Sequence, residues 1–291
     1  DSYERAGLNS YRFIFAFVGQ FIVTGTALYL ASYFGKGDNA KGYQYTLMLF
    51  AAISFVLFII TFKTTKERVK PPAEQQKNLR QDLKNLFRNR PWVVLFFVGI
   101  VSFVMFALQN LSIAYYFKYY IGQEQNVQMF NVIGTVALIL GIPFSKPLAQ
   151  KFGKRNVYIA SSLISGLFFI LLYLPGSQNI YGIYILNILA KFTYAPAVPL
   201  LWTMLADTAD YSEWKFGRRA TGLVFSAATF AQKAGWGIGG ALAGWLLVLF
   251  QFVPNMEQSA TSLNGIKLMI SVFPGVLYMS VAILLYFYAI D

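Results

Sequence analysis

Residues 220–250 read ATGLVFSAATFAQKAGWGIGGALAGWLLVLF, an apolar stretch with one charged side chain, Lys233, near its middle. A membrane-spanning helix needs about 20 mostly apolar residues, so this stretch is long enough to cross a bilayer. Lys191 is a second lysine deep inside an apolar segment, whereas all 12 Asp and Glu residues fall in loops or at segment ends. A charge at the bilayer centre costs at least about 2.5–3.5 kcal/mol and usually faces a polar cavity on a substrate or ion route. The two lysines therefore indicate a transport protein with a positively charged cavity.

The composition is that of a membrane protein, with 57% hydrophobic and only 12% charged residues. The chain contains neither Cys nor His. This excludes disulfides, Cys or His metal sites and His-assisted catalysis. The chain begins at Asp1 instead of Met, and its opening residues do not form a signal peptide. We therefore expect it to be part of a longer protein.

Apolar segments long enough to span a bilayer recur along the whole chain and are separated mostly by short polar turns. Eight are predicted, at residues 9–35, 43–63, 91–120, 126–149, 156–174, 179–206, 220–250 and 264–290. The sequence therefore predicts an all-α membrane protein.

One connection, from Lys63 to Arg90, is longer and strongly basic, and Pro71 and Pro72 interrupt it. Its second part, NLRQDLKNLF, places Leu79, Leu83 and Leu86 at helical spacing. This spacing predicts a helix that lies on the membrane surface.

The distribution of basic residues predicts the topology, because Lys and Arg gather on the cytoplasmic side of a membrane. With the N-terminus inside, the long basic loop and most other basic residues are cytoplasmic. The outer side then carries only Lys36, Lys41, Lys118 and Lys267. We therefore expect both termini to be cytoplasmic, and we attribute the net charge of +12 to topology and not to a nucleic-acid partner.

The long basic loop marks a boundary between two helix bundles. It divides the chain into two helices in residues 1–63, a cytoplasmic loop with an interfacial helix in 64–90, and six helices in 91–291. Six helices make a complete half of a major-facilitator transporter, itself a pair of inverted three-helix repeats. The fold expected is thus a major-facilitator-type bundle of about eight helices, without the first four.

Specific motifs support this fold. The stretch ADTADYSEWKFGRRATGLVFSAATFAQKAGWGIGGALAGWLL (206–247) resembles the tenth-to-eleventh-helix region of the glycoside–pentoside–hexuronide:cation symporters, sugar carriers of the melibiose-permease type. ERAGLNSYRF (4–13) resembles that family's entry into helix five, and VPNMEQS (253–259) fits its last outer loop. KPLAQKFGKR (146–155) resembles the short cytoplasmic motif of major-facilitator halves, with Gln150 where that motif usually has Asp.

The resemblance implies a function and some of its residues. It implies that Lys233 belongs to a sugar and coupling site and that Arg12 contacts sugar. It also implies co-transport of Na⁺, Li⁺ or H⁺, with the cation bound mainly on the four absent helices, and no resident cofactor or metal.

The residues around the two lysines also suit a sugar cavity. Ser226, Thr229 and Lys233 lie on one helical face with Gly237 and Gly240. The amide donors and acceptors that sugar hydroxyls need also occur beside Lys191 and within residues 91–120. The candidate substrate-binding residues are Arg12, Lys233, Thr229, Ser226, Lys191 and Asn110.

Asp207, Asp210 and Glu213 lie three residues apart on one helical face, ahead of Arg218 and Arg219. In one interpretation these five residues form a charge network that holds an inward gate shut. In another, Asp207 and Asp210 bind a divalent metal in a polytopic membrane enzyme.

The function expected is cation-coupled symport of a sugar or glycoside by alternating access, in the inner (cytoplasmic) membrane of a bacterium. The alternatives are the metal-dependent membrane enzyme and a sensor that binds sugar without transporting it.

Overall fold

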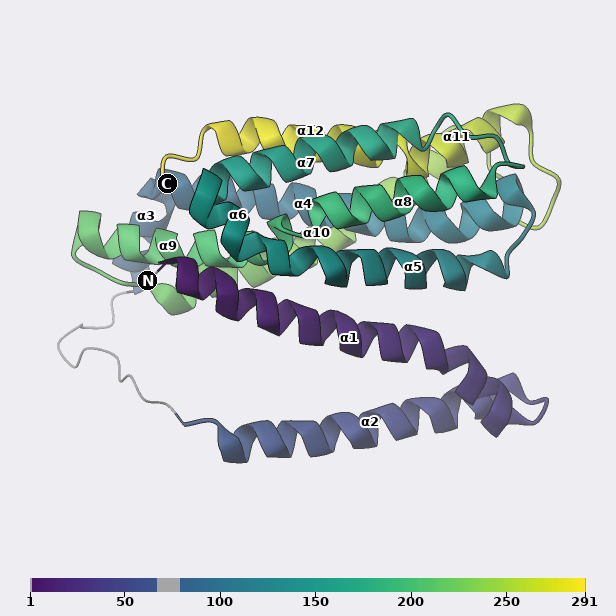
Figure 1. Cartoon of the computed structure of the whole chain (residues 1–291), viewed down its shortest axis with the longest axis horizontal. Coiled ribbons are helices and arrows are strands. Elements are labelled where there is room, and N and C mark those ends of the chain that lie inside the picture. The colour runs from purple at the N-terminus through teal and green to yellow at the C-terminus, as the bar shows by residue number, and fades with distance from the viewer. Residues whose placement is uncertain (1, 67–78, 291) are drawn as a thin grey trace. The chain divides into compact units, whose positions relative to one another are not determined.

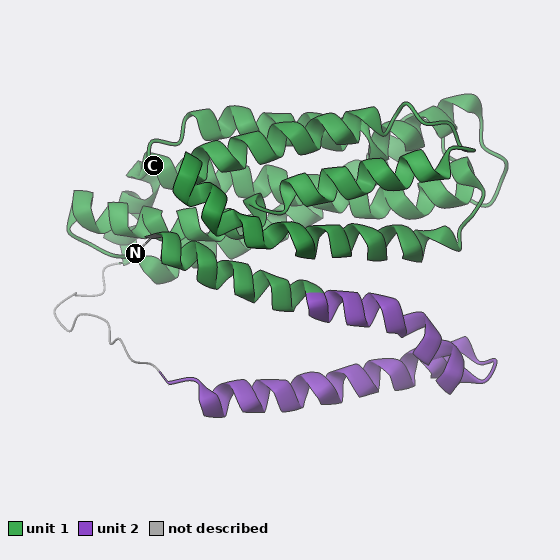
Figure 2. Ribbon diagram, viewed as in Figure 1, with its two compact units in different colours: residues 1–17, 78–291 green, residues 18–77 purple. Residues whose placement is uncertain are grey.

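A computed structural model describes residues 2–66 and 79–290, and all secondary structure within these ranges is helical. The basic positions Arg68, Lys70 and Lys77 and the prolines 71 and 72 lie outside the described residues. The chain forms two compact units, residues 18–77 and residues 1–17 with 78–291 (Figure 2). The predicted division at residues 63 and 90 remains a prediction.

The unit of residues 18–77 contains the second part of α1 (Ser2–Gly35) and α2 (Asn39–Thr64). The turn between them uses positive φ angles at Lys36 and Gly37, and the Asp38 carboxylate then caps α2 by accepting from the Lys41 amide at 3.2 Å. α2 buries only Gly42 and Thr46. A helix that is apolar on all sides and exposed within its own fold must contact lipid or other protein.

The larger unit begins with the first turns of α1 and holds the remaining helices. They are α3 (Leu79–Arg88), α4 (Arg90–Tyr115), η1 (Tyr116–Ile121), α5 (Asn126–Gly141), η2 (Ile142–Phe144), α6 (Ser145–Phe152), α7 (Lys154–Leu171), α8 (Ile180–Tyr194), α9 (Ala197–Phe216), α10 (Thr221–Leu249), α11 (Ala260–Ile270) and α12 (Val272–Tyr286). α7 packs against α8 and α12, and α4 packs against α10 and α12 (Figure 1). Large buried rings, among them Trp92, Tyr158, Tyr194 and Tyr278, fill the core between these helices.

Three of the predicted segments are broken. Residues 126–149 divide at Pro143 into α5 and α6, and residues 264–290 divide at Ser271 into α11 and α12. α8 ends at Tyr194 and α9 begins after Pro196, because proline cannot donate the backbone hydrogen bond that would continue the helix. α9 then runs to Phe216, ten residues beyond the predicted end at 206.

Six helical stretches among the described residues are long and apolar enough to cross a membrane. They are Tyr3–Gly35, Asn39–Thr64, Arg90–Ile121, Asn126–Phe152, Ile180–Phe216 and Ala260–Tyr286. α7 and α10, with 18 and 29 residues, are long enough but are not among these six. Their polar residues and glycines lower the mean hydropathy. The predicted number of about eight spans is therefore larger than the six found among the described residues.

Glycines let α10 approach α4 closely. A Cβ atom at Gly235 would lie 2.6 Å from the Phe103 Cβ, and one at Gly239 would lie 2.6 Å from the Val104 carbonyl oxygen. A Cβ at Gly237 would meet nothing within 4 Å. α10 thus has a packing face toward α4 and an open face on another side.

Replacing Gly239 with Ala should therefore destabilise the protein by about 1–3 kcal/mol, because the added methyl overpacks a contact made with backbone. Gly237→Ala is the matched control, and it should stabilise by up to about 1 kcal/mol through helix propensity. Unfolding in an SDS titration followed by circular dichroism measures both. Equal effects at the two positions would contradict the packing described for α10.

Candidate functional site

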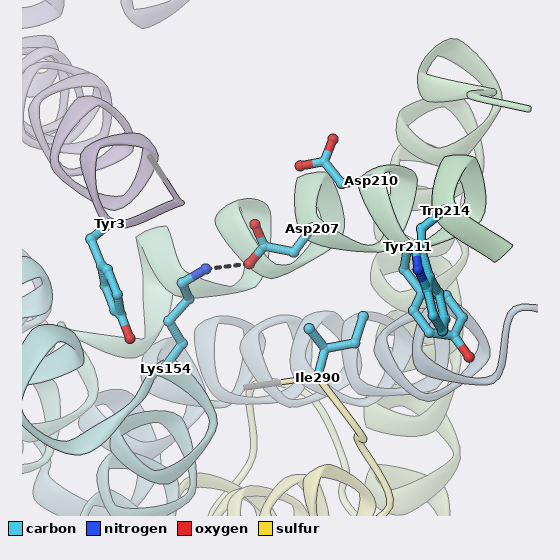
Figure 3. Close-up of a pocket in the computed structure, with 7 residues that line it drawn as sticks. All are labelled: Tyr3, Lys154, Asp207, Asp210, Tyr211, Trp214 and Ile290. Carbon is cyan, nitrogen blue, oxygen red and sulfur yellow. Dashed lines mark hydrogen bonds and ion pairs between the residues drawn. The ribbon is translucent and has the colours of Figure 1, made fainter. Parts of the chain in front are cut away.

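A largely buried carboxylate, that of Asp207 on α9, lies at one end of the larger unit. It accepts a hydrogen bond from the Lys154 ammonium (Figure 3). The Arg5 guanidinium of α1 lies 3.6 Å from the same carboxylate. Lys154 is the first residue of α7 and follows Gly153, whose φ of 81° allows the sharp turn out of α6. Asp207 therefore joins three helices that lie far apart in the sequence.

The same set of charges continues one turn further along α9. Asp210 pairs with Arg5 and, at 2.6 Å, with Arg219. Arg219 also contacts Glu213 at 3.2 Å. Four of the five residues of the predicted network therefore lie together in one cluster. The fifth, Arg218, instead pairs with Asp82 of α3 at 2.7 Å.

Residues that the sequence did not single out complete the cluster. Arg5 and Lys154 are its central cations, and Lys146 of α6 pairs with Glu4 of α1 at 2.8 Å. Lys146 and Lys154 belong to the short motif at residues 146–155, and this motif was the sequence feature that could have pointed to them. Their acidic partners lie 142 and 53 residues away, so only the tertiary fold reveals the pairs.

A cavity of about 350 Å³ opens beside this cluster (Figure 3). It is lined by Tyr3, Lys154, Asp207, Asp210, Tyr211, Trp214 and Ile290. Within the described residues, no group of three or more acidic, Cys or His side chains lies close enough to hold a metal ion. Since Asp207 and Asp210 already face cations, the arrangement supports the charge network over the metal-dependent enzyme.

Replacing Asp207 with Asn should lower the free energy of unfolding by about 3–5 kcal/mol, because Lys154 then keeps a buried charge without its carboxylate partner. Changing both residues, Asp207→Asn with Lys154→Met, should recover most of this loss. Glu213→Gln removes a more exposed carboxylate of the same cluster and should cost less than about 1 kcal/mol. Unfolding in an SDS titration measures the stability of these variants. If Asp207→Asn lowered the free energy of unfolding no more than Glu213→Gln, the strong buried pair between Lys154 and Asp207 would be contradicted.

Arg12 lies on α1 beside an aromatic surface. Its guanidinium carbon is 5.8 Å from the ring centroids of both Phe13 and Trp202. One turn earlier, the Asn9 amide donates to the Thr203 hydroxyl at 3.0 Å. An exposed guanidinium next to an indole ring combines hydrogen-bond donors with a stacking surface, which is the chemistry that recognises a sugar ring.

Lys233 lies on the open face of α10. Ser226, Thr229 and Lys233 are all exposed, and the Thr229 hydroxyl donates to the Phe225 carbonyl of its own helix at 2.9 Å. This face carries the predicted sugar-binding residues and is distinct from the glycine face that packs on α4. Arg12 and Lys233 share no contact in the described part of the chain, so the structure does not join them in one cluster.

Lys191 lies inside the larger unit and is held by a neighbouring helix. Its ammonium donates to the side-chain oxygen of Gln109 on α4 at 2.8 Å and lies 5.8 Å from the ring centroids of Phe106 and Phe169. Asn110 donates to the Phe106 carbonyl one turn back in α4, at 2.7 Å. Gln109 is wholly buried and its amide nitrogen has no partner within the described residues. The Lys191–Gln109 bond therefore joins α8 to α4.

Known proteins that are similar to this chain identify its family. The family model described as "MFS/sugar transport protein" matches residues 1–291. The chain is similar to the putative glycoside/cation symporter YagG of Escherichia coli (32% identity) and to the isoprimeverose transporter of Lactiplantibacillus pentosus (33% identity), with 99% of the chain covered in each case. It is also 24% identical to the inner membrane symporter YicJ of Escherichia coli over 98% of its length. The chain spans 61–63% of the length of these relatives.

Proposed function

Because the chain belongs to the MFS/sugar transport protein family, we propose that its protein moves a sugar or glycoside together with a cation by alternating access. The family predicted from residues 206–247 is confirmed, and it is a family of multi-pass membrane transporters and not of enzymes. The relatives named above are a putative glycoside/cation symporter and an isoprimeverose transporter, which supports a glycoside as the substrate class.

This proposal rests on a difference in solvent exposure between two kinds of ion pair in the charged cluster. Lys154 and Asp207 have side chains only 8% and 11% exposed, whereas Arg5 and Asp210 are 37% and 38% exposed. Exposed ion pairs contribute about 0–1 kcal/mol, since water replaces each partner readily. The links from α1 to α9 and α6 can therefore break and re-form, as a gate requires, while the Lys154–Asp207 pair holds α7 and α9 together.

The sugar would bind through donors that are not used in packing. Arg12 with Trp202 supplies a guanidinium and a stacking ring, and Lys233 with Thr229 and Ser226 supplies an open polar face. Lys191 is already hydrogen-bonded to Gln109 of α4, and we assign it a supporting role that holds α8 against α4. Asn110 is exposed and, like Thr229, bonds only to a carbonyl of its own helix, so it stays a candidate contact for the sugar.

Coupling would follow if the cation and the sugar each shift the conformational equilibrium only slightly and together shift it strongly. The cation would be Na⁺, Li⁺ or H⁺.

The membrane setting proposed is the bacterial cytoplasmic membrane, where the name of one relative places that protein. The proposed topology has eight spans, two before and six after the basic loop, with both ends of the chain cytoplasmic. The basic residues of the chain support this orientation.

Gradient-driven uptake of a panel of labelled glycosides, by vesicles that contain the protein in its natural length, tests the proposal. An imposed Na⁺ or proton gradient should cause accumulation, and Lys233→Ala should lower it tenfold or more, since one charged donor to a bound sugar is lost. Lys36→Ala is the matched control, because Lys36 is an exposed lysine in the turn between α1 and α2, and it should leave uptake unchanged.

Two other results would set the proposal aside. Sugar binding with neither accumulation nor counterflow would identify a sensor. A metal-dependent turnover abolished by Asp207→Ala with Asp210→Ala would identify the enzyme.

A further inference from the structure

Helix α3 presents three different faces along its ten residues. Asn85 and Leu86 are buried against the rest of the unit. Leu79, Leu83 and Phe87 follow at a spacing of four and are exposed, with 66% of Leu79 and 70% of Phe87 accessible. The next row contains Arg80, Lys84 and Arg88, which are also exposed. An apolar row and a basic row therefore run side by side along the exposed surface of one helix.

The rotation of α3 about its axis is fixed by its contacts. Asp82 accepts two hydrogen bonds from the Arg218 guanidinium, at 2.7 and 3.2 Å. The hydrogen bonds to Asp82 raise the pKa of Arg218 above its usual value. Asn89, directly after α3, donates to the Thr208 carbonyl at 2.8 Å and caps α4. Of the three leucines that the sequence places at helical spacing, Leu79 and Leu83 are exposed and Leu86 is buried.

The basic row has no acidic partner among the described residues. Asp82 is the one acid of α3, and its two oxygens are occupied by Arg218. Arg80 and Lys84 make no ion pair with a described residue, and Arg88 lies over the Phe216 ring at 5.8 Å. A row of three positive charges without an ion-pair partner in residues 2–66 and 79–290 attracts an anionic surface.

The position of α3 relative to the membrane follows from its contacts with α4 and α9. A single residue separates α3 from α4, where the candidate span Arg90–Ile121 begins, and α3 contacts α9, where the span Ile180–Phe216 ends. Figure 1 shows α3 and α9 at the same end of the unit. Trp214, near the end of α9, is 80% exposed, as expected of an aromatic residue at a membrane interface. α3 therefore lies at the level where lipid headgroups meet the acyl chains.

We propose that the exposed face of α3 is a binding surface for anionic phospholipids. Leu79, Leu83 and Phe87 enter the apolar boundary, and Arg80 and Lys84 contact the headgroup phosphates. Arg88 extends the basic row toward α9. An acidic protein would match the basic row alone, whereas a lipid surface matches the basic row, the apolar row beside it and the depth of the helix.

Retention of lipid by the purified protein tests this proposal. The protein in mixed micelles is offered phosphatidylglycerol and phosphatidylcholine in equal amounts, and native mass spectrometry counts the adducts. The wild type should retain phosphatidylglycerol preferentially. The variant Arg80→Gln, Lys84→Gln, Arg88→Gln should lose this preference by about tenfold or more, since each interfacial basic residue contributes roughly fivefold.

Two control variants make the result specific. Arg80→Lys with Arg88→Lys keeps the charge and should retain the preference. Lys36→Gln, Lys41→Gln, Lys118→Gln removes the same net charge from exposed lysines elsewhere and should also retain it. Circular dichroism checks that each variant remains folded.

Unchanged retention in the Gln variant of α3 would overturn the proposal, as would an equal loss in the Lys36, Lys41 and Lys118 variant. Displacement of the bound lipid by free inorganic phosphate would also overturn it, because the apolar row would then have no part in binding. Retention of an acidic peptide with no preference among lipids would identify a protein partner instead.

Discussion

The buried contact between the Asp207 carboxylate and the Lys154 ammonium is the constraint on which the charged end of the protein depends. Each group alone would be a costly charge in a buried place, so neither residue can change without the other. This pair fixes α9 relative to α7 and presents Asp210 and Glu213, one and two turns further, to Arg5 and Arg219. In the proposed gate, the exposed ion pairs of the cluster form and break while the Lys154–Asp207 pair stays in place.

A second constraint acts inside the membrane, where helices must approach closely without help from water. The glycines 235 and 239 of α10 bring its backbone against α4, and Gln109 of α4 in turn accepts a hydrogen bond from Lys191 of α8. These contacts occupy one side of α10 and leave the side with Lys233 open. The predicted sugar-binding residues and the packing glycines therefore lie on different sides of a single helix.

Most of the helices could be predicted from the sequence, because apolar runs and prolines act locally. The break before α9 follows from Pro196, and the amphipathic pattern of residues 79–87 correctly indicated a helix. The partners of the charged residues could not be predicted in the same way. Arg5 and Asp210 are 205 residues apart, and Arg218 pairs with Asp82 although Asp210 and Glu213 are closer in sequence. The burial of Leu86 could not be predicted either, since periodicity defines a face of the helix and only tertiary contacts decide what covers it.

Cross-linking α1 to α9 across the proposed gate is the most direct test of alternating access at this end of the helices. Residues 1–291 contain no cysteine, so Asn9→Cys with Thr203→Cys introduces a single pair within them, at a place where the Asn9 amide nitrogen and the Thr203 hydroxyl oxygen are 3.0 Å apart. We predict that an oxidant forms a disulfide between α1 and α9, that sugar uptake then stops, and that reduction restores it. We also predict that sugar with the coupling cation slows disulfide formation by favouring the open state. Uptake at an undiminished rate by the cross-linked protein would contradict alternating access through this end of the helices.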